Sequence, residues 1–474
     1  MRIMPVILWT DGLVFLLVAL IAFFAYFASR RPHLSQPWKR VARSRSGMVA
    51  AVVLSCFVAI GLLDSLHFRP MIATENGKPV YSVEVLSVFD LLVKDMKNHT
   101  EKTYSEPFSA YSFAMETVVG KGVQQRIHPR LKYGGHHLKN PEKELVPDVL
   151  KRMLVAVIEG MASWGLIASG LVLLLAQGRN FRETAAWLFG GKSEIPWNLV
   201  LGTVLLVFLF AFPAFSLSAH YHVFGTDKVG QDVFYQALKS IRTGLVIGTL
   251  TTLVMLPFAI LFGIMAGYLG GWMDDLIQYV YTTLNSIPAV LLIAASVLMM
   301  QVYIDNHPAL FETMADRADM RLLFLCMILG MTSWTGLCRL LRGEALKLRE
   351  MDYILAAQAF GVSHFRIAIR HILPNVMHIV LISVVMEFSS LVLAEAVLSY
   401  VGVGVDPSMI SFGTMINSAR LEMARDPMVW WPLLAAFLFM FAMVLSANLF
   451  ADAVRDAFDP RVASRRMLLK KEKA

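Results

Sequence analysis

The chain alternates between long apolar runs and short polar segments. The apolar runs are about 20 residues long, the length that an α-helix needs to cross the hydrocarbon core of a bilayer. Helices are the favoured spans because each helix satisfies its own backbone hydrogen bonds. We therefore predict an all-α, polytopic membrane protein with about nine transmembrane helices. The predicted spans lie near residues 6–28, 47–66, 153–176, 196–217, 242–269, 277–303, 321–341, 376–400 and 431–451.

The polar segments between the spans differ in charge, and this difference predicts their orientation. The 29–46 segment carries six arginines and lysines and no acidic residue. Basic loops stay on the cytoplasmic side of a membrane. The 304–320 segment instead contains four acidic residues and one arginine. Nine spans, with the N-terminus outside and the C-terminus in the cytoplasm, place the basic segments inside and the acidic segment outside.

Composition fits a membrane better than a nucleic acid as the partner of this chain. Of its 474 residues, 57% are hydrophobic and 16% are charged, against about 25% charged in soluble proteins. The net charge of +8 lies in short segments beside the spans, where it sets topology. We therefore expect contact with the lipid bilayer and none with nucleic acid. Cys56, Cys326 and Cys338 fall inside apolar runs, as is typical of small buried hydrophobic residues.

Two segments outside this pattern need separate interpretation. Only Arg2 precedes the first apolar run, while Arg30 and Arg31 follow it. This is the reverse of a secretory signal, so we expect a retained anchor. Residues 67–150 form a long extracytoplasmic insert of mixed charge, with an amphipathic helix predicted over Val80–Met96. The sequence leaves open whether the insert folds alone or orders only against partners.

A polar, basic stretch, Glu344–Asn375, separates two apolar runs and is therefore expected at a membrane surface. We call it the coupling segment. Within it, Met351–Phe360 is predicted as a short amphipathic helix. Gly361 suits the left-handed residue that ends many helices, and Pro374 marks the beginning of the next span. The residues predicted on one face of the short helix are Ile354, Leu355, Ala357 and Phe360.

The spacing of Ala356-Ala357, Gly361 and Leu373-Pro374 resembles the EAA loop of ATP-binding-cassette (ABC) importer permeases. The chain is most similar to the C-type permease subunit of the dipeptide/oligopeptide ABC importer family, a binding-protein-dependent transport system inner-membrane component. Leu355 departs from the pattern, because many permeases have a glutamate there. Further segments that resemble this family are His222–Asp227, Ala266–Tyr268, Gly270–Asp274, Leu398–Tyr400, Phe412-Gly413, Trp430-Trp431 and Asp459–Arg461.

The resemblance implies a type I ABC importer permease bundle in a bacterial inner membrane, forming half of a translocation pathway for di- and oligopeptides. It implies as partners a second, B-type permease subunit, two cytoplasmic ABC ATPase subunits that bind ATP and Mg²⁺, and an extracytoplasmic substrate-binding protein. It implies no catalytic residue, cofactor or metal in this chain. The ATPase-coupling residues carried over are Glu350, Tyr353, Ala356, Ala357, Gly361, Ser363, Arg366, Arg370 and Pro374.

Three other functions remain open. The first is the same machinery with a non-peptide cargo, such as a metal complex or an opine. The second is a membrane-embedded hydrolase, against which the lack of HExxH and GxSxG motifs argues. The third is a membrane scaffold or sensor, which would not need the coupling segment.

The resemblance covers about residues 220–461 and divides the chain into four parts. Residues 1–66 form an N-terminal membrane anchor with two predicted spans, 67–150 the insert, 151–217 two further spans, and 218–474 the permease core. The 38–62 stretch also resembles the beginning of the family's first span. The extra spans are then either an insertion after that span or an N-terminal addition.

Three glutamates, Glu159, Glu387 and Glu395, lie within predicted spans. Ionisable groups in a bilayer usually face a bundle interior or a wet cavity. Glu387 and Glu395, in the span after the coupling segment, are therefore candidate pathway residues. Glu395 lies either near the outer mouth, where it would meet the amine of a peptide, or near a helix end as a structural carboxylate.

Two further groups have a structural interpretation. Four glycines at 263, 267, 270 and 271 form a stripe of small residues that enters a turn, which predicts close helix packing. His220 and His222 have no companion cluster of metal ligands nearby in the sequence, so we expect no metal there.

Overall fold

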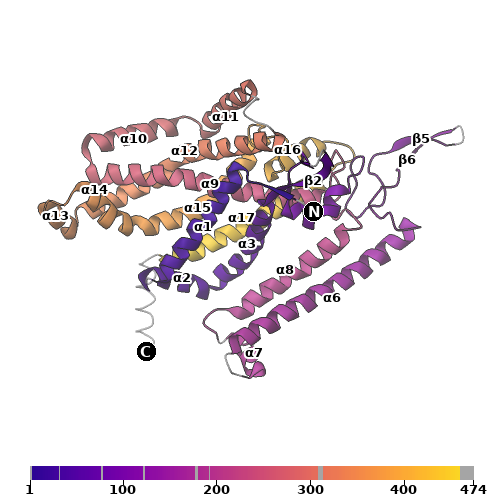
Figure 1. The fold of residues 1–474 in the computed structure, drawn as a ribbon, viewed down its shortest axis with the longest axis horizontal. Helices are drawn as coiled ribbons and strands as arrows, with labels where there is room; N and C mark the ends of the chain where they lie inside the picture. Colours follow the sequence, from indigo (N-terminus) through magenta and orange to yellow (C-terminus); the bar gives the residue numbers. More distant parts are fainter. Residues whose placement is uncertain are drawn as a thin grey trace. The chain divides into compact units, whose positions relative to one another are not determined.

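The computed structural model describes residues 3–30, 32–75, 78–120, 123–176, 180–191, 193–307 and 313–458. Helices dominate this described part (Figure 1), and nine of its helical segments are long and apolar enough to cross a membrane. The predicted fold class and number of spans are therefore confirmed. The nine segments are α1 (Trp9–Ser29), α3 (Arg45–Asp64), α6 (Pro141–Ala176), α8 (Trp197–Ser218), α9 with its last turn (Val233–Leu269), α11 (Ala289–Asn306), α12 (Met314–Arg349), the run through α15 (His364–Tyr400) and α17 (Trp431–Phe458).

The described residues form two compact units, each assembled from several stretches of the chain. The first unit takes residues from Met1–Val6, Lys39–Thr243 and Ile410–Leu449, and the second from Ile7–Trp38, Gly244–Met409 and Phe450–Ala474. The helices α9, α17 and α2 (Pro32–Arg43) contribute to both units. The basic tail after Phe458, with Asp459–Arg461, and Glu312 of the predicted acidic loop lie outside the described residues.

The single span predicted over 277–303 is wrong, because two helices occupy this stretch. α10 (Gly271–Ser286) ends before Pro288, and α11 begins after it. Proline lacks a backbone N–H and disfavours the helical conformation in the preceding residue. Ile287 is accordingly extended, with φ −88° and ψ 130°. Of these two helices, α11 alone meets the length and hydropathy of a membrane span.

Two helices extend well beyond their predicted spans. α6 and α12 each have 36 residues, about 54 Å of helix against about 30 Å of hydrocarbon. The extra turns lie at polar ends. α6 begins at Pro141 instead of residue 153, and its first turn carries Glu142 and Glu144, acidic residues that favour a helix N-terminus.

In the first unit, α6 and α8 form a long hairpin that α7 (Phe181–Phe189) closes (Figure 1). Their backbones approach closely at Gly160, where a Cβ would lie 3.3 Å from the carbonyl oxygen of Phe208. Trp164 Nε1 donates a hydrogen bond across the hairpin to the carbonyl of Leu201 at 2.8 Å. α8 also packs against α3. The two extra spans are therefore one packed module within this unit.

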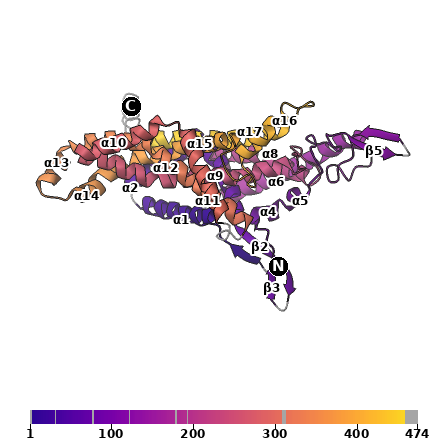
Figure 2. The ribbon, with the colours of Figure 1, turned by 90° about the horizontal axis from the view of Figure 1, so that it is seen from above.

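The insert is folded, and it contains strands as well as helices. β1 (Ile3–Val6) pairs with β2 (His67–Glu75), which also pairs with β3 (Lys78–Tyr81) and β4 (Leu86–Ser87), all antiparallel. β5 (Glu116–Gly120) and β6 (Val123–Ile127) form a second ribbon. Figure 2 shows the two ribbons pointing in different directions.

The helix predicted over Val80–Met96 is wrong in its first half. Residues 78–81 and 86–87 are strands, and helix begins only at α4 (Val88–Leu92), followed by α5 (Lys94–Asn98). Ser87 starts α4 through a capping box with Asp90. The valines at 80, 83 and 85 are β-branched and favour extended backbone, which outweighs the helical spacing of the apolar residues.

The insert packs against the segment that leads into α9. Glu101 N–H donates to the carbonyl of Gly230 at 2.9 Å, and Ser105 N–H donates to the Thr226 hydroxyl at 2.7 Å. Gly230 has φ of +78°, and a Cβ there would lie 2.0 Å from the carbonyl oxygen of Glu101. Only glycine fits this position. The insert is thus a folded cap on residues 220–232.

A buried charged group joins the same two segments. His222 Nδ1 lies 2.7 Å from Asp232 Oδ2, and His222 Nε2 lies 3.5 Å from Glu101 Oε1. Burial acts to lower the pKa of His222, but Asp232 and Glu101 outweigh it and raise this pKa to about 9. Burial acts to raise the pKa of Glu101, but the nearby His222 cation and hydrogen bonds from three backbone N–H groups bring it down to about 2. His222 is therefore a buried cation at neutral pH.

We predict that the insert loosens at alkaline pH. The stabilisation from His222 is complete below its ordinary pKa of 6.5 and is lost as the pH rises through about 9. The stabilisation from Glu101 is present above its ordinary pKa of 4.5 and is lost only as the pH falls towards about 2. Hydrogen exchange in residues 100–113, corrected for the chemical rate, should therefore accelerate between about pH 7 and pH 10.

His222→Gln should abolish this pH step. It should also raise exchange at pH 7 by about tenfold or more, because it leaves two buried carboxylates without a cation. The same change at the exposed His136 is the matched control and should leave the profile unaltered. Identical pH profiles for His222→Gln and the unchanged protein would contradict the assignment.

Candidate functional site

The surface helix predicted in the coupling segment forms as α13 (Asp352–Ala359), between two membrane helices. α12 ends at Arg349, just before it. After α13 the chain continues through α14 (His364–Ile367) and a wider, π-helical turn (Ala368–Ile372) into α15 (Leu373–Tyr400). Figure 1 shows α13 and α14 at one end of the second unit's helices.

Gly361 ends α13 in the left-handed conformation that its position predicted, with φ of +76°. Its N–H donates to the carbonyl of Gln358 at 2.9 Å, and the N–H of Val362 donates to the carbonyl of Ala357 at 3.1 Å. This pair of bonds is the Schellman motif. A Cβ at Gly361 would meet nothing within 4 Å, so the backbone angle alone requires glycine.

The buried side of the coupling segment is formed by isoleucines. Ile354, Ile367 and Ile372 have no exposed surface and belong to one core cluster that also includes residues of α9 and α12. The predicted apolar face of α13 is therefore correct at Ile354 and wrong at Leu355 and Phe360, which are 45% and 87% exposed. The helix has eight residues, so Phe360 lies past its end, and Leu355 lies about 100° around the helix from Ile354.

A tyrosine from the end of α9 holds the coupling segment at two points. Tyr268 lies in the π-helical last turn of that helix, Met265–Leu269. Its hydroxyl is 2.9 Å from Nδ1 of His364, and Gln358 Nε2 donates to it at 3.3 Å. The beginning of α14 and the end of α13 are therefore both tied to α9.

An ion pair and a close helix contact complete the site. Arg342 of α12 donates two hydrogen bonds to Asp274 of α10, at 2.6 and 2.7 Å. These bonds hold the pKa of Asp274 below its usual range. A Cβ at Gly267 would lie 2.5 Å from the carbonyl oxygen of Arg342, and one at Gly263 2.9 Å from that of Cys338. The close helix packing predicted from these glycines is confirmed.

Pro374 lies in the first turn of α15, as the prediction that it marks the beginning of the next span requires. The helical conformation nevertheless continues back to His364, so that the proline lies inside a longer helical run. A proline inside a helix removes one hydrogen bond and crowds the carbonyl four residues before it. The wider turn at Ala368–Ile372 lies directly ahead of it and accommodates the ring.

The solvent side of the coupling segment carries apolar and aromatic side chains as well as charged ones. Phe360 and Phe365 are 87% and 77% exposed. Asn375 Nδ2 donates to the Tyr353 hydroxyl at 3.1 Å, which fixes the position of that exposed ring. The exposed apolar residues of this surface, which we call the coupling patch, are Met351, Tyr353, Leu355, Phe360, Phe365 and Ile369.

All nine predicted coupling residues lie at this end of the second unit, on or beside the coupling patch. Ala357 is half-buried, and the other eight are exposed: Glu350, Tyr353, Ala356, Gly361, Ser363, Arg366, Arg370 and Pro374. The sequence prediction missed the two exposed phenylalanines and the bonds from Tyr268 and Arg342. Exposed aromatic residues beside a helix-ending glycine were the available signal, whereas the Arg342–Asp274 pair has no local signal.

The two candidate pathway carboxylates have different surroundings. Glu395 is 1% exposed and accepts a hydrogen bond from Ser399 at 2.6 Å. A Cβ at Gly404 would lie 1.9 Å from the Ser399 hydroxyl, so the backbone closes over this pair. Glu387 is half-buried and accepts from Ser390 at 3.0 Å. Their role in a pathway stays a prediction.

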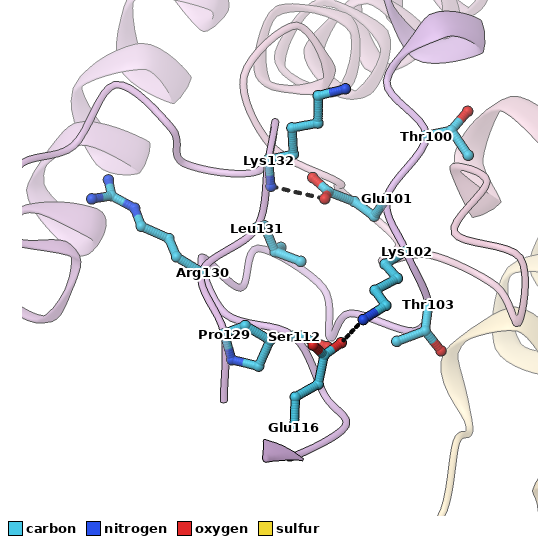
Figure 3. A pocket seen from close by; sticks show the side chains of 10 residues that line it. All are labelled: Thr100, Glu101, Lys102, Thr103, Ser112, Glu116, Pro129, Arg130, Leu131 and Lys132. Atoms are coloured by element: carbon cyan, nitrogen blue, oxygen red, sulfur yellow. Dashed lines mark hydrogen bonds and ion pairs between the residues drawn. The ribbon is translucent and has the colours of Figure 1, made fainter. Parts of the chain in front are cut away.

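The insert contains a small cavity of about 180 Å³ (Figure 3). It lies between residues 100–103 and 129–132. Lys102 forms an ion pair with Glu116 at 2.7 Å at its edge, and the carboxylate of Glu101 is bound to the backbone N–H of Lys132. The cavity belongs to the folded cap and not to the coupling segment.

The described residues thus form a multi-span helical bundle that carries a short surface helix, α13, between two of its candidate membrane spans. Residues 259–464 match the family described as binding-protein-dependent transport system inner membrane component. The chain belongs to this family and is a permease subunit of a transport system. The resemblance predicted from its motifs is confirmed.

Three curated relatives illustrate the similarity. The dipeptide transport system permease of Lactococcus lactis is 28% identical over 51% of this chain and 64% of its own length. The oligopeptide transport system permease of Mycobacterium tuberculosis is 31% identical over 52% of this chain and 78% of its own length. The glutathione transport system permease of Pectobacterium atrosepticum is 32% identical over 51% of this chain and 74% of its own length. This chain therefore spans just under two thirds of the Lactococcus relative.

We predict that Gly361→Ala destabilises the end of α13. The left-handed conformation costs an alanine about 1–2 kcal/mol, and no clash adds to it. Hydrogen exchange in residues 355–362 should accelerate by about 5- to 30-fold. Gly361→Asn, which tolerates this conformation better, should have a smaller effect. Equal exchange in the alanine variant and the unchanged protein would argue against the motif.

We also predict that Arg342 and Asp274 act as a pair. Arg342→Ala should lower the free energy of unfolding by about 1–2 kcal/mol, because a partly buried carboxylate loses two charge-assisted bonds. Asp274→Asn should cost less, and the double variant should cost less than the sum of the two. Thermal unfolding in detergent tests this cycle, and additive losses would show that the pair is not coupled.

Proposed function

We propose that this chain forms half of the translocation pathway of an ATP-driven importer of di- and oligopeptides, beside a second, B-type permease subunit. Membership of the transport family supports the permease role. Relatives named for dipeptide, oligopeptide and glutathione transport support a cargo of peptide class. A metal complex or an opine is the alternative cargo, and uptake assays with competing unlabelled compounds distinguish them.

The coupling patch is the observation that carries the proposal. Six apolar side chains face solvent on a segment whose other side is locked into the core by three buried isoleucines. Exposed apolar surface of this kind marks a site of protein contact. We propose that two cytoplasmic ABC ATPases, which bind ATP and Mg²⁺, each dock on such a patch, one on this chain and one on its partner permease.

The bonds around the coupling segment suit it to transmit force. When the ATPases close, α13 would move, and Tyr268 and Arg342 tie its surroundings to α9, α10 and α12. These helices would then shift together and open the pathway to the other side. The ATPases supply the free energy, and the two states differ in their helix contacts. This chain contributes no catalytic group in that scheme.

The proposed topology places the coupling segment in the cytoplasm and the insert outside. β1 pairs with β2 of the insert, so the N-terminal strand and the insert share one side. The basic 29–46 stretch lies one span further along, on the other side. We propose that the insert widens the surface on which an extracytoplasmic substrate-binding protein docks.

We predict that Phe360→Ser with Phe365→Ser separates the ATPases from this chain. The test is a pull-down of the tagged chain from native membranes in mild detergent, with mass spectrometry of its partners. The unchanged chain should recover a second permease and one or two ATPases. The double variant should keep the permease and lose the ATPases by about tenfold or more, because it removes two aromatic contacts.

Leu421→Ser is the matched control, since Leu421 is 72% exposed on α16 (Phe412–Glu422) and far from the coupling segment in sequence. It should leave recovery unaltered. Gly361→Pro should act like the double variant. Full ATPase recovery by the phenylalanine variant would reject the coupling role of the patch, and recovery of this chain alone would reopen the scaffold and enzyme alternatives.

A further inference from the structure

Glu159 of α6 is an acidic residue on the outside of a membrane helix. It lies in the apolar stretch 153–176, and its side chain is exposed. Among the described residues, none is hydrogen-bonded or ion-paired to it. A carboxylate in contact with lipid is costly, and such residues in membrane helices almost always have a partner.

Glu159 lies too deep in the apolar stretch for its carboxylate to reach the polar surface of the membrane. Arg152, which donates to Asp148 at 2.7 Å, marks the polar end of the helix. Glu159 lies seven residues further on (159 − 152), about 10 Å along the axis. A glutamate side chain is too short to bridge that distance, and the guanidinium of Arg152 is bound to Asp148 and His220. The counter-charge of Glu159 must therefore lie within the bilayer.

The neighbouring helix does not supply this counter-charge. α6 contacts α8 through Gly160 and Trp164. These two residues lie about 100° or more around the axis of α6 from Glu159. The sequence of α8 contains no charged residue. The carboxylate therefore points away from the hairpin partner, and that partner holds no group that could neutralise it.

The residues that share the face of Glu159 suit a second helix. Val155 precedes Glu159 and Ala162 and Leu166 follow it at helical spacing, and all three are exposed. Gly170 continues this face, and a Cβ there would meet nothing within 4 Å. Small residues let another helix approach closely, and a polar residue beside them adds an interhelical hydrogen bond. We call these five residues the Glu159 stripe.

We propose that the Glu159 stripe docks a transmembrane helix of another protein subunit, and that this helix carries an arginine, lysine or histidine at the depth of Glu159. The charge requires a cationic partner, and the small residues require a helix at close range. The extra two-span module then has a specific role, which is to recruit or orient that subunit. This interface is separate from the coupling patch and does not depend on the nature of the cargo.

A photo-crosslinking residue at position 166, in native membranes, tests the proposal. We expect a crosslink to one membrane helix of another protein, with a basic residue level with Glu159 when mass spectrometry maps the site. The control position is Phe210 on α8, which is 71% exposed and should react with lipid. Reaction of position 166 with lipid alone, or with another helix of this same chain, would overturn the proposal.

Two variants identify the charge as the cause. Glu159→Leu should reduce the crosslink at 166 by about threefold to tenfold, while Ile158→Leu, at the adjacent exposed position, should not. Glu159→Arg should lose the crosslink, and exchange of the partner's basic residue for glutamate should restore it. An unchanged crosslink in Glu159→Leu would reject the proposal.

The stability of the purified chain distinguishes a contact of Glu159 with another subunit from a contact inside this chain. Because no described residue is hydrogen-bonded or ion-paired to Glu159, Glu159→Leu should leave the thermal unfolding of the purified chain unchanged, and a lowered unfolding temperature would contradict the proposal. Recovery of the ATPases, measured in the same membranes, reports on the coupling patch. Loss of the crosslink at position 166 and loss of the ATPases therefore report separately on the Glu159 stripe and on the coupling patch.

Discussion

The close approach of α9 and α12 at Gly263 and Gly267 is the contact on which the coupling segment depends. Any side chain at Gly267 would collide with the backbone of α12. In lipid, the hydrophobic effect does not drive helices together, so close van der Waals packing between α9 and α12 must hold them. This contact fixes the position of Tyr268 relative to α12, and the Tyr268 hydroxyl is bonded to residues of α13 and α14. The two ends of α13 and α14 that meet Tyr268 are therefore bonded to a packed helix and not to a loop.

In the first unit, the insert lies outside the apolar spans, and charged side chains hold it in place. His222 between Glu101 and Asp232 ties residues 100–113 to the segment before α9, and Lys239 of α9 reaches Asp64 and Asp90 at 2.5 and 3.0 Å. Buried ion pairs are costly to form but very costly to break singly. They therefore favour one docked arrangement of the cap.

The sequence predicted most of the membrane architecture, because apolar length is a property of each span alone. It also predicted α13 and the left-handed Gly361, since both depend on local spacing. It failed at Pro288, where proline divides the predicted span into α10 and α11. It failed at Val80, where β-branched residues outweighed a helical spacing. The pairs Arg342–Asp274 and His222–Glu101 join residues far apart in the chain, and no local pattern indicates them.

Two carboxylates in the apolar helices illustrate how the structure refines such predictions. The sequence places Glu395 and Glu159 in the same class, as ionisable groups inside spans. In the structure, Glu395 is enclosed and bonded to Ser399, whereas Glu159 faces outward from α6 without a bonded group among the described residues. The bilayer penalises an unpaired charge in either position. Glu395 satisfies that constraint within its own chain, and Glu159 can satisfy it only through a neighbour. An outward-facing charge therefore indicates an assembly contact, whereas an enclosed one is compatible with structure alone.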